Sequence, residues 1–319
     1  MSGRLADDEE VRTWQEDGWV LVEGLIGTDD IDAAADDMYQ HFPSAEAYHA
    51  DPEGVTQKWL SRPRQLSDPI WPDEGPGFRD EQHAFQGRFP FRGSGKMNRL
   101  TVHPSLVNFV ERALGSEDVR VYQVGASAKY TGVTNYEQPM HTDRNHSWLP
   151  PRSEPPYWFM EGFLYLSDVN EGEAPTHLVK TSLTQDRSSN TVLYMPNDDP
   201  ELYALERPAN GVRGSFLAYR NDVFHRAVDL TAPGGSRFLI NVSFKVAGHD
   251  WIGYDSLQSH ASESEWIRFA EKSSPRELAL YGFPEPGHPV WTKSLLAETA
   301  AKYPKLDMTP WVDAFEEGG

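Results

Sequence analysis

The 319-residue sequence contains no cysteine. This absence excludes disulfide bonds, cysteine-ligated zinc, iron–sulfur clusters and thiol nucleophiles, so any metal site must be built from other side chains. Long apolar runs are also lacking, and the first ten residues show neither the basic nor the apolar region of a signal peptide. The sequence therefore predicts a cytoplasmic protein without a membrane-spanning segment.

Basic residues are scarce relative to acidic ones. There are 29 Lys and Arg against 49 Asp and Glu, which gives a net charge of −20. Phosphate binding needs clustered cations, so nucleic acid is not an expected partner, and we interpret the acidic runs as solvated surface. With 38% hydrophobic residues the composition is that of an ordinary globular protein, for which we expect one domain over residues 1–319. Composition predicts no particular oligomeric state.

The expected order of elements is helical, then mainly β, then helical. Helices are predicted at 7–17, at 29–41 after an N-cap at Thr28, and at 104–114, with a first strand at 18–22. Short strands separated by Gly and Pro are predicted at 119–124, 126–130, 157–166, 176–180, 191–195, 214–219, 223–228 and 237–245. They are typical of an antiparallel sandwich or barrel, with a core at about 115–248. The remaining chain, 250–319, is predicted to be a helical C-terminal extension with helices at 263–271, 275–281 and 293–303.

Residues 43–98 interrupt this pattern. The segment is rich in Pro, Gly, Trp and charge and has little periodicity, which is typical either of a poorly ordered segment or of a functional covering loop. Its aromatic content favours the second interpretation. We therefore predict an insert that serves as a lid.

The stretch 138–148 carries a candidate metal-binding pair. His141 and Asp143 are two residues apart, and on an extended strand such residues project from the same face, where an imidazole and a carboxylate can bind one metal ion. The motif alone is weak, because chance supplies about two such matches in a chain of this composition. The second match, His49-Ala50-Asp51, lies in a polar stretch without a strand pattern, and we predict a loop there.

The predicted strand at 223–228 offers a third ligand. His225 alternates there with apolar neighbours, and two His with one carboxylate form the facial triad of non-haem Fe(II) sites. Arg237 opens the next strand and can bind a carboxylate through two N–H groups. In a simple hairpin Arg237 would lie roughly 16 Å from the residue opposite His225, too far for one small dicarboxylate. A turn that crosses between sheets about 10 Å apart, as in a jelly roll, would bring both within its reach.

The ordered set His141-x-Asp143, His225 and Arg237 resembles the Fe(II)/2-oxoglutarate-dependent dioxygenases, in particular the phytanoyl-CoA dioxygenase-like family. The segments 17–25 and 164–177 support the resemblance, which covers roughly residues 10–250. It implies a mainly β fold with flanking helices around a double-stranded β-helix (jelly roll) core.

The resemblance also implies roles for individual residues. His141, Asp143 and His225 would hold Fe(II), and 2-oxoglutarate would chelate the iron through its 2-oxo acid end. Arg237 would bind the distal carboxylate of this cosubstrate. Gln123 and Lys129, on the strand before the motif, resemble family positions near the cosubstrate.

The reaction implied by the resemblance consumes 2-oxoglutarate and O2 and gives succinate and CO2 as coproducts. A C–H bond of a small-molecule metabolite would be hydroxylated or otherwise oxidised. Relatives that halogenate carry a small residue at the position of Asp143, so hydroxylation or a related oxidation is expected here. The segment Ala174-Pro175-Thr176-His177 departs from the Pro-Gly-Ser-His of many relatives. Together with the insert and the C-terminal extension, this departure leaves the substrate unassigned.

Other interpretations of these residues stay open. The chain fits a jelly-roll enzyme that uses a divalent metal for isomerisation or hydrolysis without a cosubstrate, or a non-catalytic binding protein of the same fold. The side chains that flank the motif, Arg144, Trp148 and Trp158, are candidate substrate-pocket residues, although core packing explains the aromatic ones equally well. His146 and His177 are expected to make structural hydrogen bonds.

Overall fold

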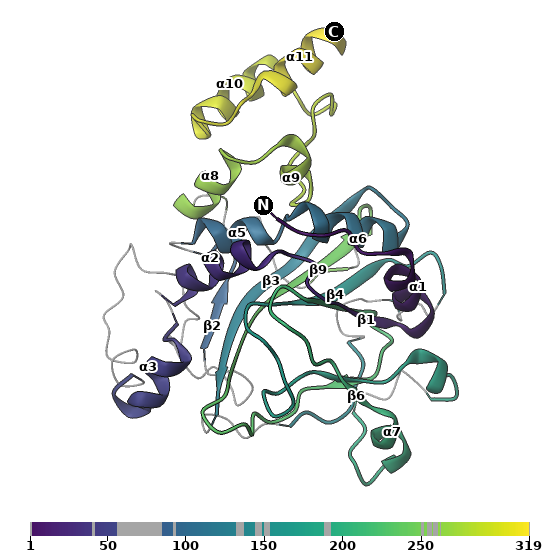
Figure 1. The fold of residues 1–319 in the computed structure, drawn as a ribbon. Coiled ribbons are helices and arrows are strands. Elements are labelled where there is room, and N and C mark those ends of the chain that lie inside the picture. Colours follow the sequence, from purple (N-terminus) through teal and green to yellow (C-terminus); the bar gives the residue numbers. More distant parts are fainter. Residues whose placement is uncertain are drawn as a thin grey trace.

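Two antiparallel sheets form the centre of the protein (Figure 1). The structure, a computed structural model, describes residues 2–39, 42–55, 85–91, 94–131, 137–143, 149, 154–187, 193–249, 252–253, 257, 261 and 263–318. The larger sheet has the strand order β1-β7-β4-β9-β3-β2, and the smaller has the order β6-β5-β8. This arrangement confirms the predicted mainly β fold with flanking helices.

The strands differ greatly in length between the two sheets. Those of the larger sheet are β1 (Trp19–Val22), β2 (Phe85–Arg88), β3 (Val119–Tyr130), β4 (Phe159–Tyr165), β7 (Phe216–Tyr219) and β9 (Ser236–Val246). Those of the smaller sheet are β5 (His177–Leu178), β6 (Arg207–Pro208) and β8 (His225–Arg226). The two strands predicted at 119–124 and 126–130 are one strand, β3, with an irregularity between Val121 and Gln123.

The two faces of the larger sheet have different environments, because successive side chains of a strand point to opposite sides. On β9, Phe238, Ile240 and Val242 pack into the main hydrophobic core together with residues of the helices. The alternate residues, among them Arg237 and Ser243, point into the space between the sheets, where Ser243 contacts Glu161 of β4. Polar side chains therefore line the interior that faces the smaller sheet.

Helices cover the outer, apolar face of the larger sheet (Figure 1). They are α1 (Asp8–Asp17), α2 (Thr28–Met38), α5 (Gly95–Leu100) and α6 (Pro104–Leu114), which ends as predicted at Gly115 in the left-handed conformation. The predicted N-cap of α2 was wrong. Gly27 takes that position without a side-chain hydrogen bond, and Thr28 is already helical. The Gly27 N–H donates to the Ser2 carbonyl.

The C-terminal helices lie beyond α5, on the side away from the smaller sheet (Figure 1). They are α8 (Ser264–Ala270), α9 (Pro275–Ala279), α10 (Lys293–Lys302) and α11 (Thr309–Gly318). Aromatic side chains join them to the main core, with Phe89 stacked on Tyr281 at 4.7 Å between ring centroids. In the described part of the chain no helix has the length and apolar character needed to cross a membrane.

Several elements were not predicted, among them β2, α5 and β6, and one motif was placed wrongly. The helices α7 (Pro200–Leu205) and α11 were missed. The predicted loop at His49 is instead the last turn of α3 (Ala45–Ala50), which Ser44 caps and which the His49 side chain anchors to the Gly235 carbonyl at 2.9 Å. Within the insert, 56–84 and 92–93 lie outside the described residues, so the lid stays a prediction.

Candidate metal centre

Two of the predicted ligands lie directly opposite each other at the edge of the smaller sheet. His141 and His225 exchange both backbone hydrogen bonds, at 3.1 and 2.8 Å, and Met140 pairs in the same way with Tyr194 on its other side. Directly opposite residues of an antiparallel pair project to the same face. The two imidazole centroids are accordingly 4.5 Å apart.

Asp143 completes a set of three convergent side chains. Its Oδ1 lies 3.8 Å from Nε2 of His141 and its Oδ2 lies 3.4 Å from Nε2 of His225. One ligand atom from each of the three residues falls within 4.8 Å of the others. Two imidazole nitrogens and one carboxylate oxygen are the donor set of a non-haem iron centre, so the geometry brings the predicted triad together.

The backbone sets the orientation of both imidazoles. Nδ1 of His141 is 2.8 Å from the Pro139 carbonyl, and Nδ1 of His225 is 3.0 Å from the Val223 carbonyl. A carbonyl accepts only an N–H, so each ring carries its proton on Nδ1 and directs the lone pair of Nε2 towards Asp143. This arrangement of the second nitrogen is usual for metal-binding histidines, and the residues present therefore fit a bound metal ion.

Buried polar groups form hydrogen bonds with Asp143. The Tyr219 hydroxyl donates to Asp143 Oδ2 at 2.9 Å, and Asn221 donates to the Asp143 carbonyl at 3.4 Å. Asn221 also donates to Glu161 at 2.8 Å, and Glu161 is completely buried and accepts from Ser243 as well. Burial, together with the charges of Asp143 and Glu161, raises the pKa of Tyr219 well above its ordinary value, so this hydroxyl remains a neutral donor.

Two buried cations lie side by side between the sheets. Lys129 of β3 is directly opposite Arg237 of β9, and their exposures are 1% and 5%. Lys129 donates to the Val228 carbonyl at 3.0 Å and Arg237 donates to the Ala174 carbonyl, but Nε of Arg237 is buried without a partner. Within the described residues neither cation forms an ion pair. A pair of this kind is costly unless an anion neutralises it.

The charge states of these two side chains reflect their burial. Burial and the neighbouring Arg237 lower the pKa of Lys129 to about 8. Burial alone lowers the pKa of Arg237 to about 10. Both groups are therefore cationic at neutral pH, although their surroundings disfavour the charge.

The turn between β8 and β9 crosses from one sheet to the other. His225 belongs to the smaller sheet and Arg237 to the larger one. Of the two predicted paths, the structure therefore has the turn that crosses between sheets and not the simple hairpin. Ser243, on the same face of β9 as Arg237, contacts Glu161, which accepts from the Asn221 that also contacts Asp143. The metal ligands and the two cations therefore face the same interior.

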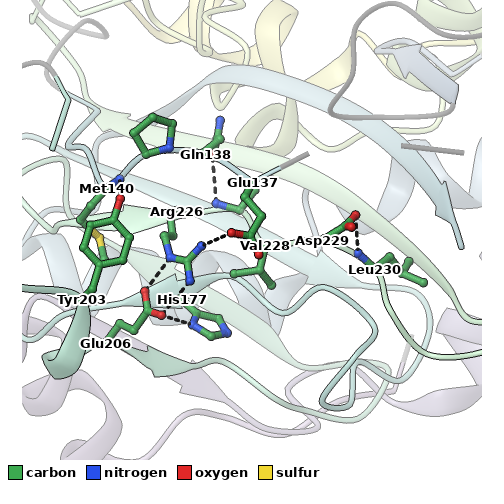
Figure 2. Close-up of polar contacts among 12 residues, drawn as sticks. Glu137, Gln138, Met140, His177, Tyr203, Glu206, Arg226, Val228, Asp229 and Leu230 are labelled. Carbon is green, nitrogen blue, oxygen red and sulfur yellow. Dashed lines mark hydrogen bonds and ion pairs between the residues drawn. The ribbon is translucent and has the colours of Figure 1, made fainter. Parts of the chain in front are cut away.

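A cluster of charged side chains lies on the face of β8 opposite His225 (Figure 2). It links the chain segments that carry the metal ligands. Glu206 accepts two hydrogen bonds from Arg226, at 2.7 and 2.8 Å, and lies 3.0 Å from Nδ1 of His177. The Arg226 guanidinium lies over the ring of Tyr203, whose hydroxyl accepts from the backbone N–H of Met140 at 2.9 Å. The residues adjacent to His141 and His225 are thus tied together. His177 lies within ion-pair distance of Glu206, and the hydrogen bond expected of it stays a prediction.

The other candidate residues are not among the three convergent ligands or lie outside the described residues. Gln123 accepts a 3.5 Å hydrogen bond from Ser243 and is six residues from Lys129 on β3, about 20 Å along the strand. Trp158 is half-buried, and its ring lies 5.8 Å from that of His249. Arg144, His146 and Trp148 are not among the described residues. Roles for Gln123, Arg144, Trp148 and Trp158 stay predictions.

Sequence reasoning missed Tyr219, Asn221 and Glu161. Tyr219 ends the uniformly apolar run Phe216-Leu217-Ala218-Tyr219, in which no residue stands out as polar. Glu161 lies within another buried strand, where only its charge among apolar neighbours marks it as unusual. That signal could have singled out Glu161, but the partners of both residues depend on strand register.

No protein-family model matches the sequence, and no curated protein matches it. Solved structures do resemble the fold. The carbocyclase SnoK, described as non-haem and α-ketoglutarate-dependent, from nogalamycin biosynthesis, has a TM-score of 0.52 at 16% identity over 82% of this chain and 93% of its own. AviO1 from Streptomyces viridochromogenes Tue57 has a TM-score of 0.52 at 13% identity over 79% of this chain and 100% of its own.

A third solved structure is the epimerase SnoN in complex with Fe3+, α-ketoglutarate and nogalamycin RO. Its TM-score is 0.50 at 14% identity, over 75% of this chain and 83% of its own. At these identities the likeness concerns the fold alone. It confirms that the sandwich described above is the jelly roll of such enzymes.

Proposed function

We propose that the chain is a non-haem Fe(II)- and 2-oxoglutarate-dependent oxygenase that oxidises a C–H bond of a small-molecule substrate. The observation that carries this proposal is the presence of two complementary groups in one interior space. One is the convergent set His141, Asp143 and His225, and the other is the buried cation pair Lys129 and Arg237. The first suits a divalent iron and the second suits the far carboxylate of a short dicarboxylate.

The residues divide the binding of metal and cosubstrate between the two sheets. His141, Asp143 and His225 supply three ligands with a total charge of −1, which leaves three positions of an octahedral ion open. Lys129 and Arg237 neutralise and orient the distal carboxylate of 2-oxoglutarate, and Nε of Arg237 gains the partner that it lacks among the described residues. Bound iron would supply the reductive activation of O2 that couples conversion of 2-oxoglutarate into succinate and CO2 to oxidation of the substrate.

The cation pair also weighs against a metal-dependent isomerase or hydrolase. Such an enzyme has no cosubstrate carboxylate, so two adjacent buried cations would destabilise the fold unless its substrate were itself an anion. The same cost argues against a binding protein whose site has lost its function. Both alternatives remain outcomes of the test below.

The oxidation is proposed to be a hydroxylation, and solved structures of this fold include enzymes with other reactions. SnoK is described as a carbocyclase and SnoN as an epimerase, both α-ketoglutarate-dependent. A product assay must therefore distinguish a gained oxygen atom, an unchanged composition and the loss of two hydrogens. The phytanoyl-CoA dioxygenase-like family remains our proposed assignment.

Succinate formation tests the proposal. Protein loaded with Fe(II) is incubated with 2-oxoglutarate, O2 and a panel of small molecules, and succinate is quantified with and without each compound. We expect iron-dependent succinate that a true substrate increases and that Asp143→Ala abolishes. Product formation without O2 or 2-oxoglutarate would instead establish the isomerase or hydrolase. Iron binding without any turnover would establish the binding protein.

A further inference from the structure

Tyr219 contacts two of the three residues of the candidate metal centre. Its hydroxyl donates to Asp143 Oδ2 at 2.9 Å, and its ring centroid is 4.7 Å from that of His225. The side chain is 3% exposed and belongs to the hydrophobic cluster between the sheets, which includes Leu178 and Leu217. Its place is therefore fixed by packing, and the hydroxyl has a defined direction.

The hydrogen bond distinguishes the two oxygens of Asp143. Oδ1 lies 3.8 Å from Nε2 of His141, whereas Oδ2 accepts from Tyr219 and lies 3.4 Å from Nε2 of His225. A carboxylate can bind a metal through one oxygen or through both. Each carboxylate oxygen has two lone pairs, so the hydrogen bond from Tyr219 occupies one of those on Oδ2 and makes this oxygen a weaker ligand than Oδ1.

The number of oxygens bound decides how many positions remain for reactants. Two imidazoles and one oxygen leave three positions of an octahedral ion, enough for a chelating 2-oxo acid and O2. A second oxygen would leave two positions, which the chelating cosubstrate alone would fill.

We propose that Tyr219 is a positioning residue that restricts Asp143 to binding the metal through Oδ1 alone and so keeps the third position open. This inference rests on the proposed function. Tyr219 belongs to the larger sheet, so a residue of one sheet would control how many oxygens of Asp143 bind a metal held beside the other sheet.

The backbone of Asp143 is fixed by a separate set of contacts. Asn221 donates both to the Asp143 carbonyl and to the buried carboxylate of Glu161, which Tyr122 and Ser243 also contact. With the main chain held in this way, the hydrogen bond from Tyr219 acts on the orientation of the carboxylate.

The variant Tyr219→Phe removes this hydroxyl and keeps the ring. Tyr157→Phe is a matched control, because Tyr157 is also buried and its hydroxyl donates at 2.8 Å to a backbone carbonyl, that of Gln15. Tyr157 packs in the main core, on the other face of the larger sheet. Unfolding of both metal-free variants in urea gives the structural cost of losing one buried hydroxyl.

Two spectroscopic titrations read out the coordination. Co(II) shows ligand-field bands whose intensity falls as its coordination number rises, and it is added without cosubstrate. Fe(II) protein is then titrated anaerobically with 2-oxoglutarate. For Tyr219→Phe we expect a changed Co(II) spectrum at an affinity for Co(II) within about threefold of the unmodified protein, and about a tenfold to hundredfold loss of 2-oxoglutarate affinity.

Tyr157→Phe should match the unmodified protein in both titrations. The proposal is overturned if Tyr219→Phe keeps its Co(II) spectrum, or if it loses metal and cosubstrate affinity together in proportion to its loss of stability. If the unmodified protein binds metal but no 2-oxoglutarate, the proposed function fails and the Co(II) spectra alone decide the role of Tyr219. If it binds no metal, both fail.

Discussion

Lys129 and Arg237 are direct cross-strand partners on β3 and β9, with both charges buried and neither in an ion pair among the described residues. Burial, and then repulsion between these like charges, lowers the pKa of Lys129. The protein retains this unfavourable pair in the interior that its metal centre faces. When an anionic ligand binds, the same two cations become stabilising. The predictions for Lys129 and Arg237 depend on this change.

Removing one of the cations should stabilise the metal-free protein and weaken binding of 2-oxoglutarate. Lys129→Met is expected to raise the free energy of unfolding of the metal-free protein by about 1–2 kcal/mol, because the pKa of Lys129 is lowered to about 8. Arg237→Met should lower 2-oxoglutarate affinity at least about tenfold and leave metal affinity unchanged. Urea unfolding and anaerobic titration check these outcomes. Arg120→Met, on β3 but paired with Asp118, is the control and should leave 2-oxoglutarate affinity unchanged.

Affinity for 2-oxoglutarate should depend on pH through Lys129. Its pKa in the unliganded protein is about 8, and a bound carboxylate raises it, so above that pH binding must take up a proton. The dissociation constant should be flat below pH 8 and rise about tenfold per pH unit above it. Titrations between about pH 6.5 and 9 measure this slope. The slope should vanish in Lys129→Met, and a slope that persists there would assign the proton to another group.

The metal-binding role of His225 can be separated from its structural role. His225→Ala should abolish tight binding of Co(II) or Fe(II), since two protein ligands remain of three. His177→Ala is the control, because His177 is on the neighbouring strand and lies against Glu206 rather than in the centre. Calorimetric titration with Co(II) measures both variants. Equal loss in both would mean that damage to the smaller sheet, and not ligation, explains the effect.

The cluster of charged side chains on the face of β8 opposite His225 should stabilise the fold over a defined pH range. Burial raises the pKa of Glu206, but the hydrogen bonds from Arg226 and the contact with His177 outweigh it and lower the pKa from 4.5 to about 2. A carboxyl group with a lowered pKa stabilises the fold above its unfolded value, and this contribution is lost as pH falls towards 2.

Glu206→Gln should therefore cost about 2 kcal/mol of unfolding free energy at pH 7, and the difference from the unmodified protein should shrink below about pH 4.5. Urea unfolding of the metal-free protein at several pH values provides the test. Glu201→Gln, on an exposed acid of α7, should have little effect. A cost independent of pH would show that packing of the side chain, rather than its charge, is responsible.

Local spacing predicted the triad, because each inference needed only the geometry of a strand. The i, i+2 relation of His141 and Asp143 and the inward alternation of His225 both depend on a few neighbouring residues. The crossing between sheets was one of two alternatives, and the structure selects it. Chain order alone could not choose between them, since the turn at 229–235 suits either path.

Features that depend on register could not be predicted. That Lys129 lies opposite Arg237 requires the alignment of β3 with β9 across an irregularity near Gln123. The contacts of Tyr219 and Glu161 require three strands in register and a turn that brings in Asn221. The helix at His49 was missed for a different reason. Its six residues are stabilised by the Ser44 cap and by distant contacts rather than by a periodic apolar face.

The central claim is that His141, Asp143 and His225 hold an iron that 2-oxoglutarate chelates while Lys129 and Arg237 bind its other end. Anaerobic addition of Fe(II) and then 2-oxoglutarate, followed by visible absorption, tests this most directly. The account predicts a weak metal-to-ligand charge-transfer band that saturates with cosubstrate, disappears in His225→Ala and needs at least about tenfold more 2-oxoglutarate in Arg237→Met. Tight iron binding without any band on addition of 2-oxoglutarate would contradict it.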